Sequence, residues 1–366
     1  MVLDTSAIIA DARMAGKVFS GSIDDYPDGI IIPVDKPYRW TSADVVRKIK
    51  WAACKHFGRK NLKVGHAGTL DPLATGVLLV CVGKACRLAE NLQKEEKEYV
   101  AGISFGATTP SYDLEKAVDK LYPVDNVSEK TVLELLPRFI GEQEQVAPLF
   151  SAKSVDGVRA YELARKQFKD KGLAKTDVIE GFDHSVAETL NVQKINIYDL
   201  ELLAFEPHSS TMAGTPLNLG LDRSQQSENG WDTVNLGRTQ PQRSENGWDT
   251  VNLGRTQPQR SEDGLGPDSA VSQSANVAKG PDGRINVADT SGLDLPLATI
   301  RISCSKGTYI RAFARDLGEA LGSGAHLNSL RRTKTGGFDA ETALSVSQAV
   351  SLFPTRNREK PDGQDN

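Results

Sequence analysis

The chain lacks any hydrophobic run that approaches the roughly 20 apolar residues needed to cross a bilayer. Its first residues, MVLDTSAIIADARMAG, contain no basic leader and carry an acid at Asp4. We therefore expect a cytoplasmic protein with no membrane association. Hydrophobic residues still make up 39% of the 366 residues, which is enough to build a core.

Cysteine is scarce, with four in the chain. Cys81 and Cys86 stand near each other, but neither a second pair nor a clustered histidine completes a metal-ligand pattern. A phosphate-binding loop is also missing, because Gly83-Lys84-Ala85 lacks the spaced glycine and the Ser/Thr of such loops. No strand-linked GxGxxG motif occurs either. We expect free thiols in a reducing compartment, no bound metal and no cofactor.

The small net charge of −4 hides an uneven distribution of basic residues. Lysine and arginine gather in two segments, 36–63 and 301–334. A basic surface suits a polyanionic partner, since phosphate contacts supply most non-specific affinity for nucleic acids. Charge-rich helices that only face solvent would give the same pattern.

The most informative segment is GHAGTLDPLATG, from Gly65 to Gly76, which holds a single carboxylate, Asp71. Small and flexible residues around it allow tight backbone geometry and leave room for a bulky ligand. Pro72 favours an extended or turn conformation for Asp71, ahead of the apolar run 77–82. The carboxylate could act as nucleophile or base. It could equally belong to a plain connecting turn.

The chain divides into an ordered part and a long interruption. We expect an extension at 1–28, a catalytic domain at 29–205 and 291–345, and a polar tail at 346–366. Between the two halves, SENGWDTVNLGRTQPQR occurs at 227–243 and again at 244–260. This 17-residue tandem repeat is too poor in apolar residues to form a core, so 206–290 is predicted to be a disordered insertion. Its tryptophans, Trp231 and Trp248, could serve as docking anchors.

Periodicity predicts the secondary structure of the ordered part. Strands are expected at GIIIPVDKP, at 77–82, around Tyr99 and at LPLATIRISCSKG. Helices are expected from a Ser42 cap to about Phe57, at 128–140, at 161–168 and at 308–321.

Several separated motifs together resemble the bacterial TruB-type tRNA pseudouridine synthases. The Gly65 turn matches G-H-x-G-T-L-D-P-x-A-x-G at every fixed position. Upstream, Lys36, Pro37, Thr41 and Ser42 match K-P-x-G-x-T-S, although Arg39 replaces its glycine. Other matches are a G-x-x-T-x-T-x-D element at Gly106, Thr109, Ser111 and Asp113, the arm QVAPLFSAKSVDGVRAYELAR, and the closing CSKGTYIRAFARDLG and LRRTKTGGF. In the arm, Ala147, Phe150 and Ser154 depart from the family pattern.

The resemblance implies the fold and the site. The fold would be α+β, the pseudouridine synthase fold, with a mixed, mostly antiparallel sheet, flanking helices and a central active-site cleft. Asp71 would be the catalytic nucleophile, paired with Arg311, and Tyr99 would stack on the target base. An ionised but partly desolvated carboxylate suits a neighbouring guanidinium. The residues expected to bind substrate are His66, Leu330, Lys36, Gly68 and Thr69. Lys36, Lys63 and the lysine and arginine residues of 301–334 are expected to contact phosphates.

The same resemblance implies the reaction and the partner. The protein would be an isomerase that converts uridine 55 in the T loop of tRNA to pseudouridine, with no cofactor. Its arm, Gln145 to Arg165, would close over the T arm of the RNA. The short stretch after Phe338 leaves no room for a PUA domain of ≥ 40 residues. We expect a monomer that needs no protein partner.

Two other functions fit parts of the sequence. An RNA-binding or tRNA-folding module would use the same arm and basic segments without chemistry. A metal-dependent nuclease could use Asp35, Asp71 and Asp113, although they lie in unlike turns. Intact Asp71, Tyr99 and Arg311 favour the enzyme.

Overall fold

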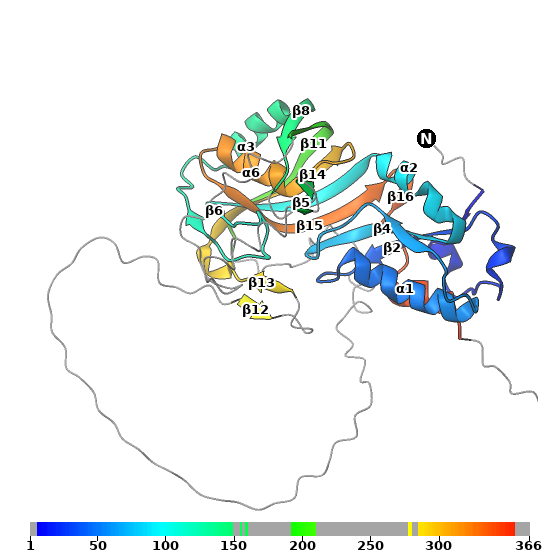
Figure 1. The fold of residues 1–366 in the computed structure, drawn as a ribbon. Coiled ribbons are helices and arrows are strands. Elements are labelled where there is room, and N and C mark those ends of the chain that lie inside the picture. Colours follow the sequence, from blue (N-terminus) through cyan, green and yellow to red (C-terminus); the bar gives the residue numbers. More distant parts are fainter. Residues whose placement is uncertain are drawn as a thin grey trace, which may run out of the picture. The chain divides into compact units, whose positions relative to one another are not determined.

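A ten-stranded mixed sheet forms the framework of the protein (Figure 1). The strand order is β1-β2-β4-β15-β5-β14-β11-β8, with β3 on β4 and β16 on β15. Only the β1–β2 and β4–β15 pairs of this sheet are parallel. This computed structural model describes residues 6–148, 154–155, 158–159, 192–209, 277–279 and 285–355. The α+β fold with a mostly antiparallel sheet is confirmed.

The strands of this sheet are β1 (Ile8–Ile9), β2 (Ile30–Lys36), β3 (Val64–Ala67), β4 (Ala74–Val82), β5 (Lys97–Phe105), β8 (Gly141–Val146), β11 (Val192–Ser209), β14 (Leu295–Cys304), β15 (Ala325–Thr335) and β16 (Phe338–Asp339). Three short pairs lie outside it: β6 (Ala107–Thr108) with β7 (Lys120–Leu121), β9 (Ser154–Val155) with β10 (Val158–Arg159), and β12 (Val277–Lys279) with β13 (Asn286–Ala288). Among the described residues, the α-helices are α1 (Ser42–His56), α2 (Ala89–Lys94), α3 (Glu129–Leu135), α6 (Ile310–Ala320) and α7 (Val346–Ser351).

The strands β2 and β4 are apolar on both faces. Ile30, Ile32 and Val34 enter the main core with Val45 and Ile49 of α1. The alternate residues of both strands enter a second core with Leu92 and Phe338. Burial on both sides explains why 77–82 reads as a continuous apolar run and not as an alternation.

The N-terminus of α1 differs in detail from the prediction. Thr41 caps the helix, in a capping box with Asp44, and Ser42 is the first helical residue. The sequence alone does not show which of the two hydroxyls caps the helix. The Ser42 hydroxyl bonds instead to Leu70, a residue distant in sequence. Gly58 follows the helix with a φ of +65°, as its stop signal predicts.

The helix predicted at 128–140 is present but changes form. Ser128 caps α3, and its last turn is a 3₁₀ helix at Leu136–Phe139. Pro137 stands at the start of that turn, where it cannot donate the bond that would continue an α-helix. The helix predicted at 308–321 is confirmed as α6. The one at 161–168 lies outside the described residues.

Described residues on the outer side of the boundaries placed at 28 and 345 pack with the catalytic domain, so these boundaries were wrong. Strand β1 pairs with β2, and Phe19 packs against Phe353 with ring centroids 5.0 Å apart. His56 of α1 joins the two ends, because its ring nitrogens contact Ser20 O at 2.8 Å and Pro354 O at 2.9 Å. Weak periodicity hid these segments, although about half of their residues are apolar.

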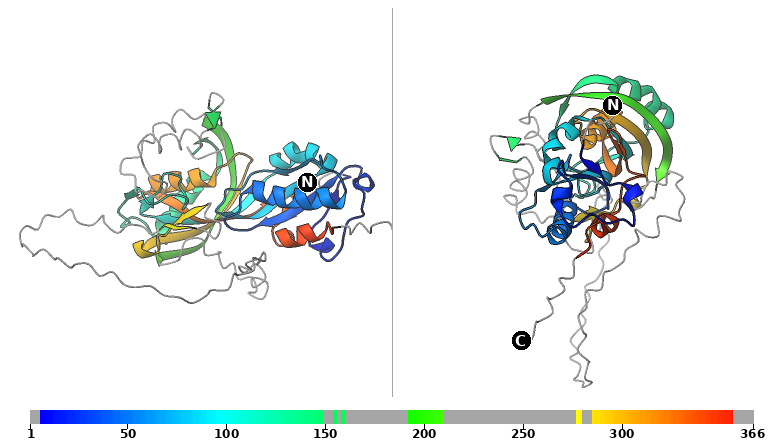
Figure 2. Two further views of the ribbon diagram at one scale, coloured as in Figure 1. Left: turned by 60° about the horizontal axis from the view of Figure 1, so that its bottom comes forward. Right: turned by 90° about the vertical axis from the view of Figure 1, so that its right-hand side faces the viewer.

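Strand residues also occupy both ends of the range predicted as an insertion. β11 continues to Ser209, and β13 lies at Asn286–Ala288 with Val287 and Ala288 buried. β11 has three register shifts against β14, and Figure 2 shows it bending strongly, as bulged strands do. Most of 206–290, with both repeats, lies outside the described residues. No helix within the described ranges could span a membrane.

Candidate active site

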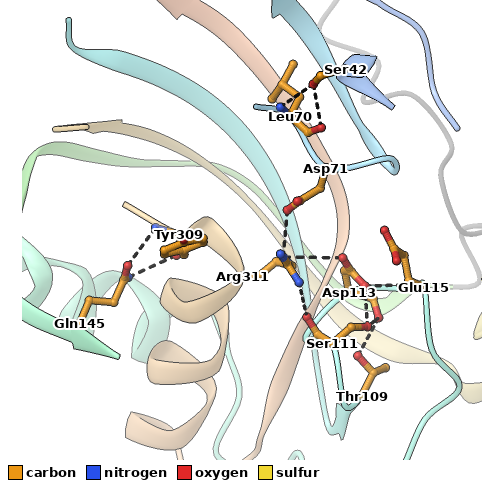
Figure 3. Close-up of polar contacts among 10 residues, drawn as sticks. All are labelled: Ser42, Leu70, Asp71, Thr109, Ser111, Asp113, Glu115, Gln145, Tyr309 and Arg311. Atoms are coloured by element: carbon orange, nitrogen blue, oxygen red, sulfur yellow. Dashed lines mark hydrogen bonds and ion pairs between the residues drawn. The ribbon is translucent and has the colours of Figure 1, made fainter. Parts of the chain in front are cut away.

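The turn that carries Asp71 joins β3 to β4, and Ser42 of α1 holds it through the neighbouring residue Leu70. The Ser42 hydroxyl accepts a hydrogen bond from Leu70 N at 2.9 Å and donates one to Leu70 O at 3.1 Å (Figure 3). Ala74 N donates to Asp71 O at 3.1 Å, which closes the turn. The Asp71 backbone is therefore fixed on both sides while its side chain stays 39% exposed.

Arg311 of α6 meets this carboxylate from the other side of the site. Its Nε lies 2.9 Å from Oδ2 of Asp71 and 3.7 Å from Oδ2 of Asp113. Its Nη1 donates to Ser111 O at 3.1 Å. The side chain of Arg311 is only 6% exposed, so two carboxylates and a carbonyl hold one buried guanidinium in a fixed position. Figure 3 shows the three groups converging on it.

Asp113 is itself fixed by its loop. Its Oδ1 accepts hydrogen bonds from Ser111 Oγ at 2.6 Å and from Glu115 N at 3.0 Å. Thr109 Oγ1 donates to Asp113 O at 2.6 Å. The G-x-x-T-x-T-x-D element therefore serves to place a buried carboxylate against Arg311, with Ser111 carrying the hydroxyl at its second threonine position.

The electrostatics follow from burial and close charges. Burial raises the pKa of Asp113, although Arg311 and Ser111 oppose that shift. Burial, with the charges of Asp113 and Asp71, raises the pKa of Glu115 to about 8. For Arg311, burial lowers the pKa, but the carboxylates of Asp71, Asp113 and Glu115 outweigh it and raise the pKa above its ordinary value. Arg311 therefore remains charged beside Asp71.

Helix α6 is positioned by a residue that the sequence assigned to the arm. Gln145 is buried, accepts from Tyr309 N at 2.9 Å and donates to Tyr309 O at 3.2 Å (Figure 3). Tyr309 is the N-cap residue of α6 and offers no side-chain cap of its own. Gln145 thus supplies the missing cap and sets where Arg311 points. Phe150 and most of the arm lie outside the described residues.

The prediction that Lys36 contacts a phosphate of the substrate is wrong, because the side chain is completely buried. Its Nζ donates to Trp40 O at 2.6 Å, Pro37 O at 3.1 Å and Pro72 O at 3.3 Å. Burial lowers the pKa of Lys36 to about 7, although Asp71 opposes the shift. Three carbonyls match the three donors of an ammonium group. Lys36 therefore ties the turn at 37–40 to the residue after Asp71.

Arg332 was expected among the phosphate contacts and is also buried. Its Nε donates to Val77 O at 2.8 Å and its Nη2 donates to Gly68 O at 3.1 Å. Gly76 passes so close that a Cβ there would lie 2.1 Å from Arg332 O. Gly76 also has a φ of +102°, so only glycine fits. Gly68 and Gly76 therefore shape the Asp71 turn around a buried arginine.

A small hollow opens beside Asp71. Leu330, expected to contact the substrate, is one of its lining residues. The lining residues are Asp71, Leu73, Ala74, Asp113, Arg311, Leu327, Asn328, Ser329 and Leu330.

Tyr99 does not line this hollow. It is 9% exposed and stands on β5 opposite Arg332 of β15. Burial raises the pKa of the Tyr99 phenol, Arg332 opposes the shift, and the nearby carboxylate of Asp71 adds to it. Tyr99 is therefore a neutral phenol in the sheet next to the site.

His66 and Thr69, the remaining expected substrate contacts, stand shortly before Asp71 in the sequence and do not line the hollow. His66 is half-buried on β3, and its Nδ1 has no hydrogen-bond partner among the described residues. Burial, with a contribution from Arg332, lowers the pKa of His66, which favours the neutral ring. Thr69 is exposed.

The nuclease alternative is not supported by this geometry. Asp35 accepts two hydrogen bonds from Arg331, at 2.9 and 3.1 Å, instead of joining Asp71 and Asp113. Within the described ranges, no three His, Cys, Asp or Glu side chains come together in a way that could hold a metal ion.

Comparison with known proteins shows the family to which the chain belongs. Residues 55–215 match the N-terminal domain of the TruB family pseudouridylate synthases. Residues 311–360 match the C-terminal domain of tRNA pseudouridylate synthase B. The class is thus that of the pseudouridylate synthases.

Within that class, the chain belongs to the TruB family. It is 36% identical to the tRNA pseudouridine synthase B of Phocaeicola vulgatus over 322 residues, which cover 88% of this chain and 92% of that protein. The Thermus thermophilus protein of the same name is 33% identical, over 86% of this chain and 75% of its own length. Among solved structures, a Cbf5-Nop10-Gar1 complex aligns at 21% identity and a TM-score of 0.44. The alignment covers 88% of this chain and 54% of that chain, so this chain spans about half its length.

Proposed function

We propose that this protein converts uridine 55 in the T loop of tRNA to pseudouridine, with Asp71 as nucleophile. The observation that carries the proposal is the ion pair of 2.9 Å between the accessible carboxylate of Asp71 and buried Arg311, at the edge of a hollow. Family membership and the names of the relatives support the tRNA substrate.

The reaction balances without an external reagent. The N1–C1′ bond of the uridine breaks, the uracil turns, and a C5–C1′ bond forms in its place. The proton lost from C5 is balanced by one gained at N1, so nothing is oxidised or reduced. Asp71 attacks either the base or the sugar, and both routes need the same ionised carboxylate at the hollow.

Arg311 supplies two conditions for that step. Its positive charge lies 2.9 Å from the carboxylate of Asp71, and its fixed position limits the directions in which that carboxylate can move. A carboxylate hydrated on every side would be a weaker nucleophile, whereas one held against a buried guanidinium is already partly desolvated.

The other residues would bind and orient the RNA. The target base must leave its stack to be rotated, and Leu330 would form one wall for it. Tyr99, buried in the sheet beside Asp71, would stack on the base when RNA opens the site, and His66 would hold the opened T loop. The basic residues that remain exposed, such as Lys63, would contact phosphates. We propose a cytoplasmic monomer that needs no protein partner.

The proposal is tested with the purified full-length chain and a T-arm stem-loop RNA, with no cofactor added. The target uridine carries tritium at C5, so product formation releases tritium to water, and chemical mapping locates the pseudouridine. We expect release and a single modified position. Protein that binds the RNA tightly but forms no pseudouridine would instead support a binding module.

A further inference from the structure

The last residues of the range predicted as an insertion pack directly against segments of the site. Val287 and Ala288 of β13 are 7% and 1% exposed. They form a small apolar cluster with Leu114, and the half-buried side chains of Leu73 and Tyr38 pack against it. We call these five residues the Val287 cluster. In the described part of the chain, none of the five belongs to either of the two larger cores.

The Val287 cluster joins segments that belong to three separate motifs of the sequence. Leu73 stands two residues after Asp71 and lines the hollow. Leu114 directly follows Asp113. Tyr38 lies in the upstream lysine-proline element. One strand outside these motifs therefore connects the segments of the two carboxylates by apolar contact.

Hydrogen bonds fix this strand against the same segments. Ala288 N donates to Leu114 O at 2.8 Å. Arg39 donates twice, from Nη2 to Ile285 O at 2.8 Å and from its backbone N to Pro72 O at 2.9 Å. Arg39 thus links the residue before β13 to the turn that carries the accessible carboxylate. It stands where the family motif has glycine, and the bond to Ile285 shows what the larger side chain does there.

The spacing between the two carboxylates matters because they share one partner. Asp71 and Asp113 lie 2.9 and 3.7 Å from the same nitrogen of Arg311. Their segments are separate in sequence, so their spacing depends on what packs against both. Strand β15 is one connection, since it pairs with β4 and bridges Asp113. The Val287 cluster is a second. A shift of about 1 Å in a catalytic group can cost about 100-fold in rate.

We propose that Val287 and Ala288 are positioning residues of the active site, which hold the segments of the two carboxylates at the spacing that Arg311 requires. Neither residue lines the hollow, so they act through Leu73 and Leu114. The inference rests on the proposed function. It gives a role in that function to residues that composition had placed outside the catalytic domain.

The test compares Val287→Ala, Leu114→Ala and the double variant with the wild type on T-arm RNA. Tritium release under single-turnover conditions gives the rate, and filter binding gives the RNA dissociation constant. We expect each single variant to lose about 10- to 100-fold in rate, with affinity within about twofold of the wild type. The double variant should be little slower than the slower single variant, because both changes open the same contact.

Two further variants separate positioning from stability. Val132→Ala removes the same two methyl groups from a fully buried position on α3, a helix that carries none of the residues of the site. It should be destabilised as Val287→Ala is, but should keep the wild-type rate. Val287→Ile retains a β-branched apolar side chain and should restore at least about half of that rate. All rates are measured well below the midpoint of thermal unfolding, so that every variant is folded.

The outcomes distinguish this inference from the proposed function. If the wild type is active and Val287→Ala keeps its rate, or if Val132→Ala loses as much, the packing is only structural and the inference is overturned. Additive losses in the double variant overturn it as well. The proposed function survives each of these results. A wild type that forms no pseudouridine overturns both. Leu114→Ala covers the case in which Val287→Ala does not fold.

Discussion

Arg311 and Asp71 lie 2.9 Å apart across the site but differ sharply in exposure, with side chains 6% and 39% accessible. The guanidinium is thus part of the interior, and the carboxylate faces the solvent side of the hollow. Asp113, 7% exposed and 3.7 Å from the same Nε, completes the arrangement. One buried cation is shared between a buried carboxylate and an accessible one.

This sharing predicts unequal effects on stability. Arg311→Met leaves two carboxylates near each other without their cation, and we expect it to lower the free energy of unfolding by about 3–5 kcal/mol. Asp71→Asn leaves Asp113 to neutralise Arg311, and we expect a loss of about 1 kcal/mol or less. Urea denaturation of the two variants measures both values. Equal losses would show that Asp113 does not share the guanidinium.

Glu115 should make stability depend on pH. Its pKa is raised from 4.5 to about 8 by burial and by the charges of Asp113 and Asp71. Below the unfolded pKa it is protonated in both states, and as pH rises towards 8 only the unfolded chain ionises fully. Its contribution is therefore present at pH 4 and lost by pH 8.

The measurement is the difference in unfolding free energy between wild type and Glu115→Gln from pH 5 to 8. We expect the wild type to lose on the order of 1 kcal/mol relative to the variant, since the side chain is partly exposed. A difference that is flat or rises with pH would contradict the assignment.

Arg39 adopts a left-handed conformation, with a φ of +65°, at the position where the family motif has glycine. Its Nη2 donates to Ile285 O at 2.8 Å. Arg39→Ala loses that bond and keeps the strain, whereas Arg39→Gly loses the bond and relieves the strain. We expect the glycine variant to be about 1 kcal/mol more stable than the alanine variant. Thermal unfolding of the pair measures this difference, and an alanine variant as stable as the glycine one would refute the strain.

The motifs predicted the pairing of Asp71 with Arg311 but not the burial of charged side chains. The Asp71 and Arg311 segments were both identified from sequence. Lys36 and Arg332 were misplaced on the surface, because their partners are backbone carbonyls, and those of Arg332 come from residues more than 250 positions away. A sequence shows that a residue is charged, not which carbonyls will surround it. The packing of Val287 was hidden for the same reason, since its neighbours Leu73 and Leu114 lie far from it in sequence.

Lys36 offers a direct check on that correction. Lys36→Met leaves three carbonyls without their donor, and we expect it to cost about 2–3 kcal/mol of stability. The dependence of RNA affinity on salt should not change, because no phosphate contact is lost. Lys63→Met, at an exposed position, is the control and should reduce the slope of log affinity against log salt by about one. A reduced slope in Lys36→Met would show that Lys36 contacts an RNA phosphate after all, and would contradict its assignment to the interior.

The nucleophilic role of Asp71 is tested most directly by single-turnover pseudouridine formation in T-arm RNA with Asp71→Asn. We expect RNA affinity within about threefold of the wild type, because the substitution removes no contact that positions the turn, and a rate at least about 10³-fold lower. Binding and mapping on the same samples keep affinity and chemistry apart. Pseudouridine formed by Asp71→Asn at a rate within tenfold of the wild type would contradict the role of Asp71 as the nucleophile.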